Sequence, residues 1–332
     1  MWFKDLTGID EISPEYVRQH IIVDGMHLIS KANKRSFQFG QLEVPTLKEL
    51  KEKSLKLPNY DGEIHLEEVV GNIGNIHADP SNAGALFQAA SQFNLLEMVG
   101  PQVTPEQGIS GYEHDLTQGP ACAIACGAGT IYRSYFASVG NQIGQSEHKQ
   151  IDCLELIDAA LKNEGKNLWK MSNGYAMFTQ EGLLQTNAIL SKFTKTERET
   201  LKDQLKIGVQ WNTEVTISSN KQLVSQAYCS ALPVAYSRLE PIYWEKFARI
   251  ILEATYEATL YAALLNRDNT GCNKVFLTLV GGGAFGNDSG WILDSLRLAL
   301  SKFKNTSLDV KIVSYEQSCP LIKDLIDKFS CD

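Results

Sequence analysis

The sequence predicts an α/β protein of three layers, in which helices lie on both faces of one mixed sheet. Strand-like and helix-like segments alternate through the second half of the chain. Residues 275–280 have the pattern of a buried strand that runs into glycines, and residues 291–300 then have helical spacing. Residues 241–266 form a long amphipathic segment with one apolar stripe, as expected for a helix packed on a sheet.

The first 60 residues have mixed patterns. Residues 14–28 have the apolar spacing of a helix, and residues 36–44 alternate like a strand. Residues 46–53 predict a charged helix capped by its first threonine. Residues 58–62 contain proline, asparagine and glycine, which predicts a turn.

A second group of elements follows in the first half of the chain. Residues 67–75 are strand-like, and residues 84–91 form a short apolar run that ends in polar residues. A long loop with glycines and prolines is expected over residues 97–118. A helix over residues 120–136 should follow it, because Pro120 is well tolerated in a first helical turn.

The middle and the end of the chain complete the predicted set. Helices are expected at 152–162 and 196–206, and strands at 168–178, 209–217, 222–230 and 308–313. We predict an N-terminal extension, residues 1–62, packed on one domain, residues 63–332. That domain would carry an insertion at about 140–207.

Charge and composition limit the classes of partner. The net charge of −8 argues against a nucleic-acid backbone or an anionic membrane as the main partner. Seven cysteines without a CxxC pair indicate reduced thiols in a cytoplasmic protein. The six histidines show no HxH or HxxxH spacing, so no metal site is predicted. His77 and Asp79 are a weak exception on ligand type alone.

The glycine-rich segment after the strand at 275–280 is the strongest local motif. Its members are Gly281, Gly282, Gly283, Ala284, Phe285, Gly286 and Asn287. Glycines let backbone N–H groups approach an anion, and a following helix N-terminus adds partial positive charge. The motif therefore predicts a phosphate site. The alternative is that the glycines only form a tight turn between strand and helix.

Three stretches together resemble the macrodomain fold, the module that binds ADP-ribose. They are Gly71-Asn72-Ile73, the run from Gln88 to Ser91, and Gly282 to Gly286. The loop that ends at Thr117, Gln118 and Gly119 stands where that family has its first binding loop. The resemblance covers roughly residues 65–315 and implies a three-layer, macrodomain-like mixed sheet.

The chain also departs from the macrodomain pattern. Asn72 replaces the family's aspartate, Gly84 stands where an acidic residue faces adenine, and the first loop lacks a run of glycines. The combination of residues 88–94, 112–115 and 119–123 is most similar to atypical members that include bacterial effector ADP-ribosylhydrolases. That similarity implies removal of ADP-ribose from arginine of ubiquitin.

The resemblance also suggests ligand contacts. The glycine loop and Gly119 would hold the diphosphate from two sides, and Phe285 would pack on the distal ribose. Candidate amide donors to ribose or adenine are Asn72, Asn82, Gln88 and Asn94. For each amide, capping or turn formation is an equal alternative.

Carboxylates are the candidates for catalysis, since hydrolysis at an anomeric carbon passes through an oxocarbenium-like state. Asp115 and Glu113 are the first choices because they lie two apart before Gly119, and Asp79 is the third. The alternative is that these are solvated loop acids. His114 and Asp288 are weaker candidates, as a surface residue and a helix cap respectively. Glu97 and Glu106 are further acids of the same half.

The leading hypothesis is therefore a monomeric ADP-ribosylhydrolase without a cofactor. Its partner would be an ADP-ribosylated protein, with ubiquitin as one candidate. The alternatives are a reader that binds ADP-ribose without cleaving it, and a hydrolase of poly(ADP-ribose) or O-acetyl-ADP-ribose. A Rossmann-like nucleotide enzyme is disfavoured, because no GxGxxG opens an early βαβ unit. A bacterial effector of this kind would be exported into a host cytosol.

Overall fold

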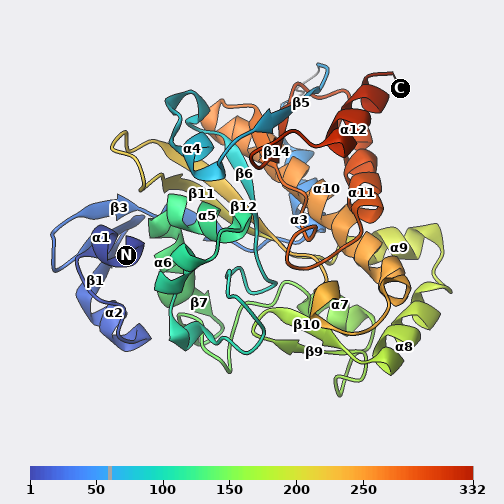
Figure 1. Ribbon diagram of the computed structural model, residues 1–332, viewed down its shortest axis with the longest axis horizontal. Helices are drawn as coiled ribbons and strands as arrows, with labels where there is room; N and C mark the ends of the chain where they lie inside the picture. Colours follow the sequence, from blue (N-terminus) through green and yellow to red (C-terminus); the bar gives the residue numbers. More distant parts are fainter. Residues whose placement is uncertain (59–61, 332) are drawn as a thin grey trace.

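The main body is a seven-stranded mixed sheet with the order β4-β11-β12-β6-β13-β14-β5 (Figure 1). The computed structural model describes residues 1–58 and 62–331. The strands are β4 (Gln41–Glu43), β5 (His65–Val70), β6 (Leu86–Ala90), β11 (Gly208–Glu214), β12 (Leu223–Cys229), β13 (Lys274–Leu277) and β14 (Asp309–Ser314). The predicted α/β class with a mixed sheet is confirmed.

Five neighbouring strands of this sheet run in the same direction. The pairs β12–β6, β6–β13, β13–β14 and β14–β5 are parallel, whereas β11 pairs antiparallel with both β12 and β4. The carboxyl ends of the five parallel strands consequently lie at one edge of the sheet. Ligands of open α/β sheets bind at such an edge.

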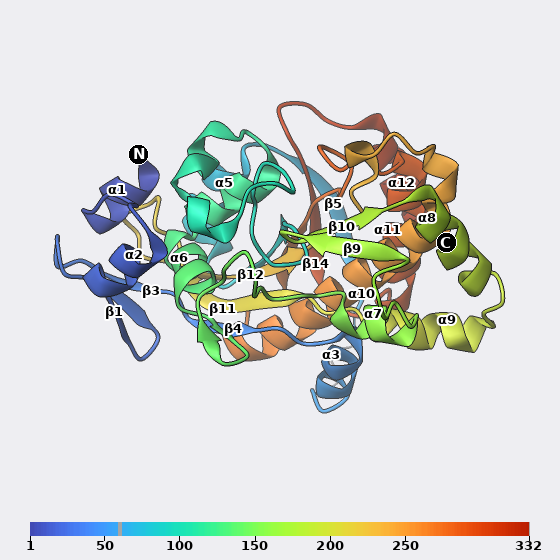
Figure 2. The ribbon, with the colours of Figure 1, turned by 90° about the horizontal axis from the view of Figure 1, so that it is seen from below.

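Helices cover both faces, which gives the predicted three layers. The helices in question are α3 (Leu47–Ser54), α4 (Ile73–Ala78), α5 (Gln118–Ala125), α6 (Gly127–Tyr135), α10 (Glu245–Thr270), α11 (Ser289–Lys302) and α12 (Pro320–Cys331). Figure 2 shows α5 and α10 on opposite sides of the sheet. Helix α10 packs beside α3 and α11, while α4 contacts α5, and α12 lies against α11 and β5.

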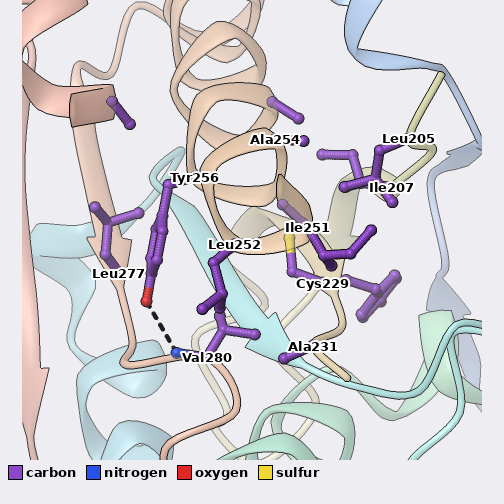
Figure 3. Close-up of a cluster of buried hydrophobic side chains, with 14 of the residues drawn as sticks. Leu205, Ile207, Cys229, Ala231, Ile251, Leu252, Ala254, Tyr256, Leu277 and Val280 are labelled. Carbon is purple, nitrogen blue, oxygen red and sulfur yellow. Dashed lines mark hydrogen bonds between the residues drawn. The ribbon is translucent and has the colours of Figure 1, made fainter. Parts of the chain in front are cut away.

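The long helix α10 supplies the centre of the core. Its residues Ile251, Leu252 and Tyr256 are at most 1% exposed. Tyr256 lies beside Leu277 of β13, Leu252 points towards Val280, and Ile251 lies on the side of Cys229 (Figure 3). Leucine and isoleucine at helical spacing build this stripe, as the sequence pattern predicts. Burial of such side chains fixes the strand end that leads into the glycine loop.

The segment at 140–207, which the sequence predicts to be an insertion, packs on the main core. Its elements are β8 (Gln142–Ile143), α7 (Glu155–Ala160), β9 (Trp169–Ser172), β10 (Tyr175–Phe178), α8 (Gln180–Leu190) and α9 (Lys195–Lys202), and β7 (Ser138–Val139) precedes it. Trp169, Phe178 and Leu183 belong to the same hydrophobic cluster as the central sheet. The ammonium of Lys202 lies 3.4 Å from Glu257 on α10 and so ties α9 to the body.

The N-terminal residues divide between two places. The elements α1 (Trp2–Thr7), α2 (Pro14–His20), β1 (Ile21–Asp24), β2 (His27–Ser30) and β3 (Ser36–Gln38) form a small unit with its own sheet. Its residues Phe3, Leu6 and Val17 share a second core with Ile131 and Tyr135 of α6. Strand β4 and helix α3, in contrast, belong to the central sheet and its helical layer.

Three predicted elements are wrong in part because a turn interrupts each of them. The helix at 14–28 ends at His20, since Ile21, Ile22 and Val23 pair as a strand with β2. The strand at 36–44 breaks at Gly40, whose φ is 75°. The strand at 168–178 is a hairpin that turns at Asn173 and Gly174, with φ of 46° and 81°.

Other boundaries shift by a few residues. The helix at 120–136 is two helices, because Cys126 leaves the helical region with φ −115° and ψ 58°. The strand at 67–75 ends at Val70, and Asn72 caps α4 instead. The predicted turn at 58–62 lies, for residues 59–61, outside the described residues. Short 3-10 helices occur at Pro80–Asn82, Pro105–Gln107, Ser110–His114, Val234–Tyr236 and Pro241–Tyr243.

Two general properties bear on the sequence-based expectations. Within residues 1–58 and 62–331, no helix is long and apolar enough to span a bilayer. Cys122, Cys126, Cys153, Cys229, Cys272 and Cys319 carry free thiols.

Candidate active site

A cavity of about 780 Å³ opens at the carboxyl ends of β5, β6, β13 and β14. The residues that follow these strands line it, including Gly71, Ser91, Thr278 and Tyr315. Pockets of this size bind ligands of the size of a drug or a nucleotide. The cavity therefore lies where the parallel part of the sheet predicts a ligand site.

The glycine loop forms one wall of the cavity. The backbone N–H groups of Gly283, Ala284 and Phe285 donate to no described residue, and all three residues line the cavity. Gly281 has φ of 81°, a conformation that allows the loop to turn here at no steric cost. Consecutive unpaired N–H groups of this kind form a backbone concavity suited to an anion.

Helix α10 fixes the start of this loop. The Tyr256 hydroxyl accepts a hydrogen bond from Val280 N and donates one to Thr278 O, each at 3.0 Å (Figure 3). At the far end, the Asp288 carboxylate accepts hydrogen bonds from Gly290 N and Trp291 N and thus caps α11. Because Asp288 engages the N–H groups at the N-terminus of α11, the donors left for a ligand are the N–H groups of the loop itself.

The N-terminus of α5 forms the opposite wall. The N–H groups of Gln118 and Gly119 donate to no described residue, and the Thr117 side chain does not cap them. The Gln118 side chain instead bridges to β6, accepting from Ala90 N and donating to Gln88 O at 2.8 Å each. A Cβ at Gly119 would lie 2.0 Å from Ala90 O, so only glycine permits this approach.

Three aromatic rings meet at one part of the cavity lining. The ring centroids of Tyr175 and Phe285 are 5.3 Å apart, and those of Tyr175 and Tyr236 are 5.0 Å apart. Tyr175 comes from the insertion, and its hydroxyl donates to Met98 O at 2.6 Å. Burial raises the pKa of Tyr175, and Tyr236 and the charge of Asp115 act in the same direction.

The charged lining of the cavity is entirely acidic. Glu97, Glu113 and Asp115 line it, and no Lys, Arg or His occurs among the described residues of the lining. Asp115 accepts a hydrogen bond from Thr117 N at 2.8 Å, at the entrance to α5. Glu113 is 26% exposed, and its carboxylate accepts a hydrogen bond from Trp2 N at 2.9 Å.

Glu97 is the only one of these three acids that is fully buried. Both carboxylate oxygens lie 3.0 Å from Nη2 of Arg133, whose side chain is 0% exposed. Burial raises the pKa of Glu97 to about 7, while the charge and hydrogen bond of Arg133 and a hydrogen bond with Tyr112 act in the opposite direction. Glu97 is thus held in one orientation beside the cavity.

Most predicted residues of the two loops line the cavity. They are Asn72, Glu113, Asp115, Thr117, Gln118, Gly119, Gly281, Gly283, Ala284 and Phe285. The Asn72 side chain accepts from Gly74 N and Asn75 N, so its oxygen is engaged as a helix cap. Within the loop, Gly282, Gly286 and Asn287 do not line the cavity, and Asn287 is buried and donates to Leu232 O.

Four predicted residues lie away from the cavity, because other parts of the fold engage them. Asp79 caps a 3-10 turn by accepting from Ser81 N, and Asn82 donates to Ile76 O. Gln88 is buried in β6 and donates to Thr259, while Asn94 donates to Gln150. These side chains hold loops and layers of the fold together. For the three amides, a structural role of this kind is the alternative to ligand binding.

The structure adds Tyr175 and Tyr236, which the sequence did not single out for the site, and it brings forward Glu97, which the sequence named only among the further acids. Tyr175 and Tyr236 come from distant segments that only the tertiary fold brings to Phe285. Glu97 is flanked by Leu95, Leu96 and Met98, and a lone acid in such an apolar run was a signal of burial. Its partner Arg133 lies on α6, and the residues around Arg133 in the sequence do not predict that it pairs with Glu97.

Metal ligands do not gather in the described structure. No group of three or more His, Cys, Asp or Glu side chains suited to a metal occurs in residues 1–58 and 62–331. His77 and Asp79, the one weak pair in the sequence, have other partners. The His77 ring bonds to Ile73 O through Nδ1 and to Gln226 through Nε2.

Comparison with known proteins gives structural neighbours only. No family model matches the chain, and no curated protein sequence matches it. The fold is similar to poly(ADP-ribose) glycohydrolase from Thermomonospora curvata, with 12% identity, 95% of each chain covered and a TM-score of 0.47. It is also similar to poly(ADP-ribose) glycohydrolase from Deinococcus radiodurans in complex with ADP-ribose, with 10% identity, 87% of this chain and 94% of that chain covered, and a TM-score of 0.44. At this level of similarity the neighbours assign neither an activity nor a residue role to this chain.

Proposed function

We propose that this protein hydrolyses the glycosidic bond between ADP-ribose and a protein side chain. One observation carries the proposal. Two separate elements, the loop at Gly283–Phe285 and the start of α5 at Gln118, direct unpaired backbone N–H groups along one cavity. Because such donors bind phosphate groups without a cationic side chain, they suit a diphosphate held from two sides.

The rest of the cavity suits the other parts of ADP-ribose. Phe285, Tyr175 and Tyr236 offer an aromatic surface to a ribose. The volume of about 780 Å³ falls within the range of sites for ligands of this size. The long acidic loop that leads into α5 ends beside both surfaces, so its carboxylates can reach the sugar next to the diphosphate.

The carboxylates of that loop provide the chemistry. In the oxocarbenium-like transition state, positive charge develops on the ribose, and a nearby carboxylate stabilises it. We propose Asp115 for this role, with Glu113 as a second acid at the cavity wall. A protein that only reads ADP-ribose gains nothing from carboxylates beside a diphosphate, which favours the enzyme over the reader.

The lining also favours a cationic leaving group. Three acids and no cation among the described lining residues attract a guanidinium and repel the further diphosphates of a polymer. The aromatic rings that line the same cavity add cation–π attraction. We therefore propose arginine-linked ADP-ribose as the substrate, in preference to poly(ADP-ribose). Ubiquitin as the modified protein is supported by the sequence resemblance alone.

The test compares substrates and variants in one assay. Purified protein should release ADP-ribose from an arginine-linked peptide faster than from poly(ADP-ribose), as measured by mass spectrometry. Asp115→Asn should reduce release by about 100-fold or more, whereas the control Asp79→Asn keeps its cap and retains activity. Binding of ADP-ribose without release from any substrate would favour a reader, and absence of binding would refute both.

Modified ubiquitin tests the finer assignment. If ubiquitin is the natural carrier, release from arginine-ADP-ribosylated ubiquitin should exceed release from a peptide with the same linkage. Equal rates on the two substrates would show that the carrier protein is not recognised.

A further inference from the structure

The strongest feature that the proposed roles leave unexplained is the buried ion pair of Glu97 and Arg133. Glu97 lines the cavity, yet its side chain is only 2% exposed. Burying two charges costs several kcal/mol unless their hydrogen bonds are satisfied, so such a pair is seldom favoured by stability alone. The burial of this ion pair beside the cavity therefore points to a functional role for Glu97.

The surroundings of Arg133 hold this pair rigidly. Its Nε donates to Leu95 O at 2.7 Å, and its Nη1 donates to Thr130 at 2.9 Å and to Tyr228 at 3.0 Å. The guanidinium carbon also lies 4.0 Å from the centre of the Tyr228 ring. With its donors engaged, Arg133 fixes the carboxylate of Glu97 through a single nitrogen, Nη2.

This arrangement leaves the carboxylate able to accept a further proton or hydrogen bond. A carboxylate has about four acceptor sites, and Arg133 Nη2 engages one on each oxygen. The Glu97 Cγ lies 3.1 Å from the position of a Cβ at Gly119, in the first turn of α5. The Asp115 carboxylate lies at the start of the same helix, where it accepts a hydrogen bond from Thr117 N. The two acids thus flank the same part of the cavity.

We propose that Glu97 is the general base that takes a proton from the attacking water. The proposal rests on the proposed function, since it assigns a residue to that reaction. An O–H bond of water and the bond from the anomeric carbon to the guanidine nitrogen break, and a carbon–oxygen bond forms. The proton of water goes to the Glu97 carboxylate, and the bonding electron pair leaves with the nitrogen. The guanidine then takes a proton from solvent, and Glu97 returns its proton to solvent.

The groups around Glu97 suit this role at neutral pH. A general base works best when its pKa lies near the working pH. Burial raises the pKa of Glu97, and Arg133 from α6 and Tyr112 from the 3-10 turn at 110–114 oppose this effect. The charge of Glu97 also acts on Cys122 of α5 and on Tyr228 of β12, which bonds to Arg133, and burial keeps both neutral by raising their pKa values.

Two variants separate catalysis from folding. Glu97→Gln removes the base but leaves Arg133 as an uncompensated buried cation, so we expect this variant to be destabilised. Glu97→Asp keeps the charge and withdraws the carboxylate by one methylene, which should lower kcat by about 100-fold while ADP-ribose affinity stays near that of the wild type. Glu106→Asp is the matched control, because Glu106 is an exposed acid of the same loop whose carboxylate accepts, among the described residues, a hydrogen bond from Glu147 N alone.

The pH profile gives a second measurement. In the wild type and in Glu106→Asp, kcat/KM should fall through a single step as the pH is lowered. In Glu97→Asp the pH at the midpoint of this acidic limb should change. Wild-type rates and an unchanged limb in Glu97→Asp would overturn the role of Glu97. If the wild type itself neither binds ADP-ribose nor releases it, the proposed function fails instead, and the two results are distinguishable.

Discussion

The hydroxyl of Tyr256 on α10 accepts a hydrogen bond from Val280 N at 3.0 Å. Val280 is 1% exposed and lies immediately before Gly281, so this contact sets the point at which β13 gives way to the glycine loop. The same hydroxyl donates to Thr278 O. A residue far away in the sequence thus positions the loop that we propose binds the diphosphate.

Removing this hydroxyl should loosen the loop. In Tyr256→Phe, Val280 N loses the hydroxyl acceptor and keeps its hydrogen bond to Thr278 O at 2.9 Å, so the free energy of unfolding should fall by about 1 kcal/mol and ADP-ribose binding should weaken. Urea denaturation and calorimetry measure both effects. Tyr261→Phe on the same helix is the control, because the Tyr261 hydroxyl has no hydrogen-bonding partner among the described residues. Equal effects of the two substitutions would contradict the role of Tyr256.

The approach of α5 to β6 depends on the absence of a side chain at Gly119. Gly119→Ala would bring a Cβ to 2.0 Å from Ala90 O, so we expect a loss of about 3 kcal/mol in the free energy of unfolding. Gly111→Ala is the matched change, since no atom lies within 4 Å of its Cβ position. It should leave stability unchanged or raise it by up to about 1 kcal/mol. Thermal unfolding that fails to separate the two variants would argue against the close approach.

The stability should depend on pH through His77. Burial lowers the pKa of this ring from 6.5 to about 4, partly offset by its hydrogen bond to Ile73 O. Below pH 6.5 the unfolded chain gains a proton that the folded chain does not, so the free energy of unfolding decreases as the pH falls towards 4. The full loss is about 3 kcal/mol from this residue. An NMR titration of His77 in the folded protein with a midpoint above 6 would contradict this account.

The sequence predicted the elements whose signals are local. The glycine loop, the Asp288 cap and the strand before the loop follow from residues adjacent in the chain, although the strand predicted over 275–280 already ends at Leu277. The turn at Asn173 and Gly174 also had a local signal, the Asn-Gly pair, and was overlooked.

The parts of the site that depend on distant residues were not predictable in the same way. Tyr175 and Tyr236 reach Phe285 from separate segments, and the Glu97–Arg133 pair joins a loop to α6. Gln88 and Asn94 were chosen for their residue type, but the fold uses their amides to join its own layers. Residue type indicates which groups can bind a ligand, whereas only the tertiary structure decides whether they face it.

The most direct test of the central claim is calorimetry with free ADP-ribose on the wild type, Gly283→Glu and Gly283→Ala. No atom lies within 4 Å of the Cβ position of Gly283, so both variants should fold like the wild type. We expect micromolar binding to the wild type and to Gly283→Ala, since both keep the unpaired N–H groups. Binding to Gly283→Glu should be lost, because its carboxylate competes with the diphosphate for those donors. Equal binding to all three proteins would show that the diphosphate does not lie on this loop, and no binding to any of them would contradict the proposed function as a whole.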